Sequence, residues 1–153
     1  MGTAALVTWL VTAVGGFYLL GTWIAKGGTR EPRTTRFPAP VIFGHFALAA
    51  VGLLVWIGYV IDGSHALAWA AFVILVPVAL LGFTMLARWL PARRASSVVS
   101  GVPAAPGATT GMTGTAQPPA ESSFPLAVVV GHGLLAVVTV VLVLLTALQL
   151  GGG

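Results

Sequence analysis

The chain has 153 residues, of which 58% are hydrophobic and only 7% are charged, and its formal net charge is +4. A soluble domain contains roughly a quarter of charged residues, so this composition excludes a water-soluble globular protein and indicates that lipid surrounds much of the chain. The basic excess is assigned to loops that orient a membrane protein, so no nucleic-acid partner is expected. The absence of cysteine excludes disulfides, thiolate metal sites, cysteine-ligated iron–sulfur clusters and covalent haem attachment.

Four apolar runs are long enough to cross a bilayer core as helices, which takes about 20 residues. In chain order they cover residues 4–25, 39–61, 66–89 and 124–150. These runs lack the alternation of apolar and polar residues that a membrane β-barrel shows. The expected fold class is therefore all-α, with four transmembrane helices in one integral membrane domain over residues 1–153.

The segment 95–123, between the third and fourth runs, is rich in Ala, Gly, Ser, Thr and Pro. It has too few large apolar residues to offset the entropy of ordering, so it is predicted to be a disordered linker. Its glycines do not form a phosphate-binding loop, because the pattern G-x-x-x-x-G-K-[ST] is missing. The three acidic residues of the chain are expected in loops or at membrane interfaces.

All seven basic residues follow the first run or lie at the end of the third. The positive-inside rule therefore places loops 26–38 and 90–123 in the cytoplasm and both termini outside, which predicts an N-out, C-out multi-pass protein of the cell membrane. The expected partners are the lipid bilayer and an unidentified protein or a second copy of the chain. The tryptophans agree with this orientation: Trp9, Trp56 and Trp69 are expected towards the outer interface, and Trp23 and Trp89 towards the inner one.

The second and fourth runs share a motif in which Phe-Pro is followed by Gly-His, 87 positions apart. The matched residues include Phe37/Phe124, Pro38/Pro125, Gly44/Gly131, His45/His132 and Leu48/Leu135. Both helices run in the same direction, and each histidine lies seven residues after its proline. Both imidazoles are therefore predicted at one depth, about 10 Å along the helix, in the cytoplasmic half of the bilayer. A weaker similarity between residues 19–26 and 80–88 predicts a duplicated two-helix unit.

A polar ring in hydrocarbon is costly unless it has a partner, so histidines inside a membrane are candidates for function. Two neutral imidazoles at one depth suit the axial ligation of a haem b iron, which makes His45 and His132 the candidate ligands. Gly44 and Gly131, next to the histidines, would let a flat cofactor approach the backbone. Tyr18, at about the same depth, is a candidate partner for the second nitrogen of one ring.

Other uses of the pair remain open. A bare cation such as Zn²⁺ or copper would need more ligands, and proton or substrate translocation would need a longer chain of ionisable groups. The main alternative is a non-enzymatic bundle with a role in assembly or transport, in which the histidines hold helices together and no cofactor binds. The sequence has no hydrolase motif, so the protein is not expected to be an enzyme by itself.

The arrangement of histidines on different helices of a four-helix bundle resembles that of small b-type cytochromes and haem-anchoring membrane subunits. The Ala-, Val-, Gly- and Arg-rich style is similar to that of actinobacterial multi-pass membrane proteins. The resemblance covers the four runs and rests on His45 and His132. It implies haem b as cofactor and electron transfer as function.

Overall fold

The computed structural model describes residues 1–30, 35–100 and 119–149. Its elements are α1 (Gly2–Ala25), α2 (Ala39–Asp62), α3 (His65–Ser100), the short 3-10 helix η1 (Ala120–Ser123) and α4 (Leu126–Ala147). The all-α prediction is confirmed. Helices α1, α2 and α4, and α3 from His65 to Pro91, are each long and apolar enough to cross a membrane. The fold is that of a multi-pass membrane protein.

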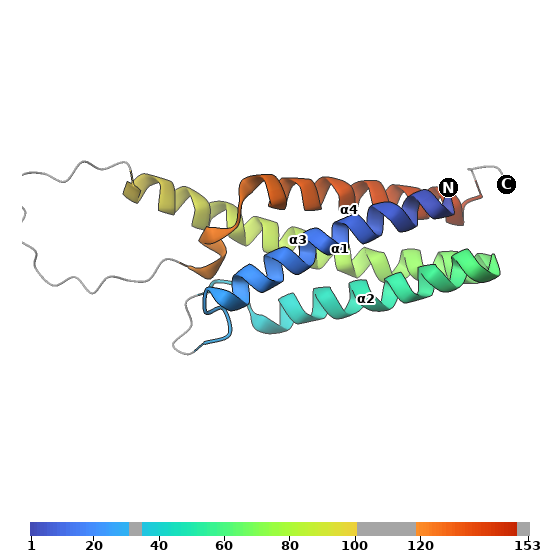
Figure 1. Cartoon of the computed structure of the whole chain (residues 1–153), viewed down its shortest axis with the longest axis horizontal. Coiled ribbons are helices and arrows are strands. Elements are labelled where there is room, and N and C mark those ends of the chain that lie inside the picture. Colours follow the sequence, from blue (N-terminus) through green and yellow to red (C-terminus); the bar gives the residue numbers. More distant parts are fainter. Residues whose placement is uncertain (31–34, 101–118, 150–153) are drawn as a thin grey trace, which may run out of the picture.

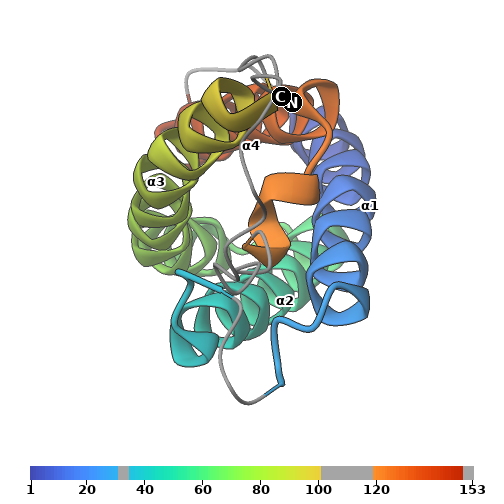
Figure 2. The ribbon, with the colours of Figure 1, turned by 90° about the vertical axis from the view of Figure 1, so that its left-hand side faces the viewer.

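The four long helices form an elongated bundle in which helices that follow one another along the chain run antiparallel (Figure 1). Viewed down its length, the bundle places them in a ring in the order α1, α2, α3, α4 (Figure 2). The closest packing is within two pairs, α2 with α3 and α1 with α4, and looser contacts join the pairs. Within the described residues the backbones of the diagonal helices α2 and α4 do not touch. Only side chains can bridge that diagonal.

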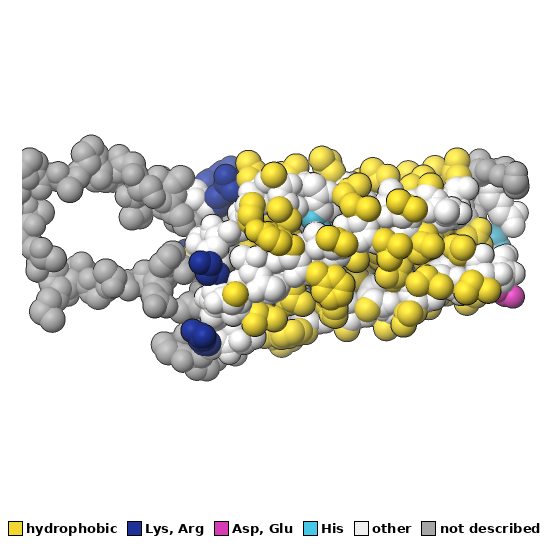
Figure 3. Space-filling model, viewed as in Figure 1, with side chains coloured by type: hydrophobic (Ala, Val, Ile, Leu, Met, Phe, Trp, Pro, Cys, Tyr) yellow, Lys and Arg dark blue, Asp and Glu magenta, His cyan; other side chains and the backbone are white. Residues whose placement is uncertain are grey.

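Apolar side chains cover the sides of the bundle along its length (Figure 3). Val14, Leu54 and Ile61 are 70%, 68% and 81% exposed, which is unfavourable in water and favourable against lipid. The basic residues gather at one end, as predicted for the two basic loops, although Arg33 lies outside the described residues. We call this the basic end; it carries Lys26, Arg30, Arg36, Arg88, Arg93 and Arg94. The opposite end carries Asp62 and is called the Asp62 end.

Proline sets the start of the two helices that carry the repeated motif. Pro38 and Pro125 directly precede α2 and α4, each with a φ of −63°. Proline suits this position because its fixed φ fits a helix start and its missing N–H would have no intrahelical partner there. His45 and His132 are consequently the seventh residues of their helices, about 10 Å from the start. Helix α4 is shorter than predicted: it begins two residues after Phe124, and Leu150 lies outside the described residues.

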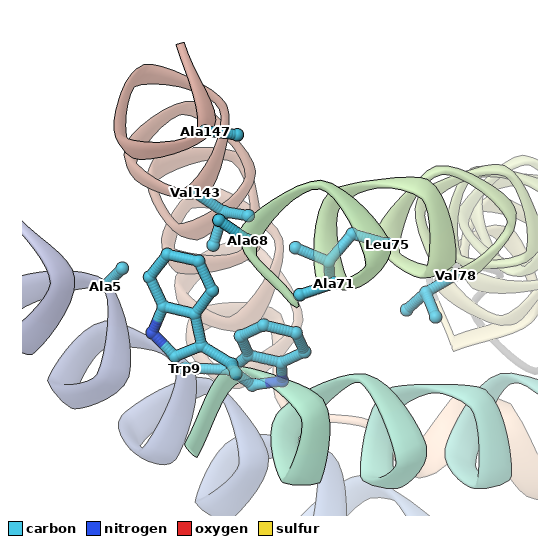
Figure 4. Close-up of a cluster of buried hydrophobic side chains, with 9 residues drawn as sticks. Ala5, Trp9, Ala68, Ala71, Leu75, Val78, Val143 and Ala147 are labelled. Atoms are coloured by element: carbon cyan, nitrogen blue, oxygen red, sulfur yellow. The ribbon is translucent and has the colours of Figure 1, made fainter. Parts of the chain in front are cut away.

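The interior of the bundle contains two apolar clusters. The Asp62-side cluster comprises Ala5, Trp9, Trp56, Ala68, Ala71, Leu75, Val78, Val143 and Ala147 (Figure 4). The basic-end cluster comprises Trp23, Phe37, Ile42, Trp89, Ala120 and Phe124. Four of the five tryptophans are therefore buried in the core. Their indoles fill the interior of the bundle: Trp9 and Trp56 lie in the Asp62-side cluster, and Trp23 and Trp89 lie in the basic-end cluster.

Both ends of the segment predicted to be a disordered linker, 95–123, are helical. Helix α3 continues through Pro91 to Ser100, and η1 covers Ala120–Ser123. Viewed from the basic end, η1 lies within the ring of helices (Figure 2). It is ordered there because Ala120 and Glu121 are buried against the helix ends. The remaining residues of the predicted linker, 101–118, lie outside the described residues.

Candidate functional site: a histidine pair at the centre of the bundle

The two histidines of the repeated motif meet inside the bundle. The ring centroids of His45 and His132 are 6.4 Å apart, and the ring planes are inclined at 57°. The two side chains come from the diagonal helices α2 and α4, so both project toward the bundle axis. They lie between the two apolar clusters, since Ile42 belongs to the basic-end cluster and Leu48 packs against the Asp62-side cluster. The prediction that the two imidazoles lie at one depth is confirmed.

Each imidazole is hydrogen-bonded to the helix with which its own helix packs most closely. Nδ1 of His45 lies 2.9 Å from the carbonyl oxygen of Val78 in α3, and Nδ1 of His132 lies 2.9 Å from the carbonyl oxygen of Thr12 in α1. A carbonyl oxygen can only accept a hydrogen bond, so Nδ1 is the protonated nitrogen in both rings. In a neutral imidazole with this tautomer, Nε2 carries a lone pair and no proton.

The Nε2 atoms are the unsatisfied groups of the site. Neither forms a hydrogen bond within the described part of the chain. Every fully buried side-chain nitrogen and oxygen in that part has a partner, so the two Nε2 atoms are not sealed off from their surroundings. Both imidazoles are partly buried, and histidine atoms are visible between the helices nearer the basic end (Figure 3). In the tautomer that these hydrogen bonds indicate, each ring of the pair therefore has one lone pair without a partner among the described residues.

A glycine lies against each imidazole. A Cβ at Gly82 of α3 would be 3.4 Å from Cε1 of His45, and a Cβ at Gly16 of α1 would be 3.2 Å from Cε1 of His132. The distance at Gly16 is shorter than an ordinary carbon–carbon contact, and the distance at Gly82 is at the lower limit of one. In each helix the glycine lies four residues after the residue whose backbone carbonyl accepts the hydrogen bond from the ring: Gly16 after Thr12, and Gly82 after Val78. The two rings therefore share a glycine and a carbonyl acceptor in the same relation, although His132 also faces Gly15, whose counterpart 66 positions later is Leu81.

The glycines next to the histidines have a different environment. A Cβ built at Gly44 or Gly131 would meet no atom within 4 Å, so neither residue mediates a close helix contact. That they face a cofactor stays a prediction. Tyr18 lies on the outside of the bundle with 52% of its surface exposed, and backbone carbonyls take both Nδ1 atoms. Tyr18 is thus not the hydrogen-bond partner of either ring nitrogen.

Sequence comparison alone could have identified the glycines that contact the rings. The similarity between residues 19–26 and 80–88 pairs Gly82 with Gly21. A Cβ added at Gly21 would meet nothing within 4 Å, so Gly21 does not contact a ring. An offset of 66 instead pairs α1 with α3 over a longer stretch. The matches are Ala4/Ala70, Ala5/Ala71, Val7/Val73, Ala13/Ala79, Gly16/Gly82, Phe17/Phe83, Leu20/Leu86 and Trp23/Trp89. This second alignment agrees with the contacts of the two imidazoles.

A buried carboxylate closes the basic end of the bundle. Glu121 of η1 is fully buried; its Oε2 accepts a hydrogen bond from Oγ1 of Thr35 and its Oε1 accepts one from the backbone N–H of Arg36, both at 2.8 Å. Nε1 of Trp23 donates to Oγ1 of Thr35 at 2.9 Å, and Nε1 of Trp89 donates to the backbone carbonyl of Glu121 at 3.0 Å. We call these five residues the Glu121 clamp. Glu121 lies in the connection between α3 and α4, outside the four spanning segments, but it is buried there.

The histidine pair differs from a metal site built by the protein alone. Within residues 1–30, 35–100 and 119–149 there is no group of three or more His, Asp or Glu side chains that could hold a metal ion. The pair can therefore supply two ligands, and a cofactor would have to supply the others. No protein-family model, curated protein or solved structure matches the chain. The chemistry of the site is therefore inferred from the geometry of the pair.

Proposed function

We propose that the protein transfers electrons in a membrane, with His45 and His132 as the two axial ligands of one haem b. The observation that carries this proposal is the pair itself: two imidazoles from diagonal helices, each with its Nδ1–H bonded to a backbone carbonyl and its Nε2 unpaired. Haem supplies, when bound, a redox centre that takes up and releases one electron.

The separation of the rings supports a single metal atom between them. A metal–imidazole bond is about 2 Å long and the nitrogen lies roughly 1 Å from the ring centre, so two imidazoles on opposite sides of one metal atom have centroids roughly 6 Å apart. The observed separation is 6.4 Å. The apolar clusters on both sides of the pair suit the porphyrin, whose ring is largely apolar. These two observations support our proposal that His45 and His132 would hold the iron of haem b.

The chain prepares both ligands through their hydrogen bonds. Each Nδ1–H bond fixes one imidazole against the neighbouring helix and keeps the proton on Nδ1, so Nε2 can bind a metal without losing a proton first. A backbone carbonyl that accepts from Nδ1–H also makes the imidazole a stronger electron donor to a metal. The two apolar clusters keep bulk water away from the pair, which favours a stable bis-histidine site.

The matching surroundings support an internal duplication of a two-helix unit. In this proposal α1–α2 corresponds to α3–α4, with an offset of 66 between α1 and α3 and of 87 between α2 and α4. The correspondence exchanges the two closely packed helix pairs and also exchanges His45 with His132. The site would then lie on a pseudo-twofold axis. An iron atom with two identical axial ligands has the same symmetry, which favours haem over a chain of unequal proton carriers.

The distribution of charge supports an N-out, C-out orientation in the cell membrane. Both basic stretches lie at one end of the bundle, which we place in the cytoplasm, and the histidine pair then lies in the cytoplasmic half of the bilayer. Because the chain contains no cysteine, labelling of a single introduced cysteine reports on which side of the membrane that position lies. A membrane-impermeant maleimide applied to intact cells should label Asp62→Cys and leave Arg30→Cys unlabelled. The reverse pattern would overturn the orientation.

The same hydrogen bonds favour one alternative function. They tie α2 to α3 and α4 to α1, so the histidines could hold a non-enzymatic bundle together without a cofactor. Such a protein would act in assembly or transport. This alternative leaves the two Nε2 atoms without a role, whereas haem ligation uses both.

Absorption spectroscopy of the protein purified in detergent, after expression with haem supplied, separates the two functions. We expect a Soret band and a sharp band in the reduced state from the unmodified protein, and loss of both bands from His45→Ala and from His132→Ala. His65→Ala is the matched control, because His65 is exposed at the Asp62 end and bonds Ala147 instead. A folded protein without these bands, or bands that survive in both variants, would contradict haem binding and favour the alternative.

A further inference from the structure

We propose that Gly16 and Gly82 are positioning residues: the missing side chain of each lets one imidazole reach the backbone carbonyl four residues earlier, which sets the tautomer of the ring. This inference deepens the proposed function, because the tautomer decides which nitrogen can bind iron. It concerns the chain's own hydrogen bonds, so it can be tested on the protein without haem.

The geometry of an α-helix limits access to its carbonyl oxygens. The carbonyl oxygen of residue i accepts the N–H of residue i+4, so the side chain of residue i+4 lies beside that oxygen. A second donor can reach the oxygen only if the side chain leaves room. In α1 the oxygen belongs to Thr12 and the residue beside it is Gly16; in α3 the oxygen belongs to Val78 and the residue beside it is Gly82.

Each glycine leaves the space that one imidazole occupies. A Cβ at Gly16 would lie 3.2 Å from Cε1 and 3.7 Å from Nδ1 of His132. A Cβ at Gly82 would lie 3.4 Å from Cε1 and 3.9 Å from Nδ1 of His45. Alanine at Gly16 would therefore push the ring of His132 by a few tenths of an ångström away from the carbonyl, and alanine at Gly82, whose Cβ would be at the limit of ordinary contact, would displace the ring of His45 less. The Nδ1–O distance of 2.9 Å would lengthen, and the bond that holds the proton on Nδ1 would weaken.

The same arrangement of glycine, carbonyl and imidazole occurs twice. The two glycines lie on different helices, yet each touches the same atom, Cε1, of the ring that it faces and each has the same relation to the accepting carbonyl. Gly15, next to Gly16 in α1, also faces His132, but a Cβ there would lie at an ordinary contact distance of 3.5 Å from Cβ and Nδ1, and a Cβ at Gly21 or Gly44 would meet nothing within 4 Å. Ordinary helix packing by small residues would not require this agreement between the two halves of the bundle.

The test is the nitrogen NMR spectrum of the full-length protein, without haem, labelled with 15N at histidine. In the unmodified protein we expect both His45 and His132 to be protonated at Nδ1 and unprotonated at Nε2. Gly16→Ala should shift the signals of His132 toward a mixture of tautomers and leave His45 unchanged. Gly82→Ala should do the reverse.

The controls are Gly21→Ala on α1 and Gly44→Ala on α2, which should change neither imidazole. Equal changes in the controls and in the two test variants would overturn the inference, as would a proton on Nε2 in the unmodified protein. If an alanine variant fails to fold, the tautomer of each imidazole in the unmodified protein becomes the test of the inference. In the haem-bound protein, both test variants should also raise the reduction potential, because a weaker Nδ1–H bond makes the ligand a poorer donor to ferric iron.

The outcomes distinguish this inference from the proposed function. If the protein binds no haem but shows the expected tautomers and the expected shifts in the variants, the positioning role of the glycines is retained and electron transfer is rejected. If the protein binds haem through both histidines but Gly16→Ala and Gly82→Ala have no selective effect, electron transfer is retained and the positioning role of the glycines is rejected.

Discussion

The histidine pair and the Glu121 clamp are two polar features in the interior of the same bundle, and they are built differently. The pair comes from two helices with matching sequences, and each ring uses a backbone carbonyl as its acceptor. The clamp joins η1, the segment before α2, the end of α1 and Trp89 of α3. Its carboxylate has no counterpart in the other half, because the residue 87 positions before Glu121 is Thr34.

The two features also differ in what they leave unpaired. Both carboxylate oxygens of Glu121 accept hydrogen bonds, whereas each imidazole keeps one nitrogen without a partner. A buried polar group that is fully paired contributes to the stability of the fold, while an unpaired one is costly unless a ligand uses it. The comparison therefore assigns a role in stability to the clamp, while ligand binding at the pair remains our proposal.

The largest effect on stability is expected from Glu121→Ala. The substitution removes the acceptor of the Thr35 hydroxyl and of the Arg36 N–H and leaves a cavity, so we expect the free energy of unfolding to fall by about 3 kcal/mol. Reversible unfolding in mixed detergent micelles measures this change. If the clamp and the histidine pair act independently, Glu121→Ala protein that remains folded should keep the absorption bands of the histidine site.

The matched control is Asp62→Ala, which removes an exposed carboxylate at the other end of the bundle and should change stability by less than about 0.5 kcal/mol. Equal losses from the two variants would show that the clamp does not stabilise the bundle. Loss of the absorption bands from folded Glu121→Ala would show that the clamp and the histidine pair are coupled, which would contradict their separate roles.

A smaller effect is expected from Trp89→Phe. Phenylalanine keeps most of the buried apolar surface but loses the indole N–H that donates to the Glu121 carbonyl, so the free energy of unfolding should fall by about 1–2 kcal/mol. Trp69→Phe, at a partly exposed indole that packs against Phe72, should cost less under the same conditions. A larger loss from Trp69→Phe than from Trp89→Phe would contradict the role of the clamp.

The four spans and the common depth of the histidines could be predicted from the sequence because each depends on residue type and spacing alone. A run of apolar residues of sufficient length predicts a spanning helix, and seven residues between proline and histidine set the depth of the ring in α2 and α4. Proximity of the rings then followed from two parallel helices in one small bundle. The separation of 6.4 Å depends on side-chain packing across the diagonal, so spacing alone could not supply it.

The partners of the rings and the clamp could not be predicted in the same way. The acceptors at Thr12 and Val78 are backbone carbonyls, which every residue carries, so no residue type marks them. Tyr18 was the polar side chain at a suitable depth, but depth along a helix does not give the direction around it. Glu121 stands in a stretch of small and polar residues, and its burial depends on contacts with segments more than 30 positions away in the chain.

Electron paramagnetic resonance of the haem-loaded, oxidised protein tests the central claim most directly, because the spin state of ferric haem reports its axial ligands. Two imidazoles from His45 and His132 should give a low-spin signal, and His45→Ala or His132→Ala should convert it to a high-spin signal or abolish binding. A high-spin signal from the unmodified protein, or a low-spin signal that survives in both variants, would contradict a shared bis-histidine site.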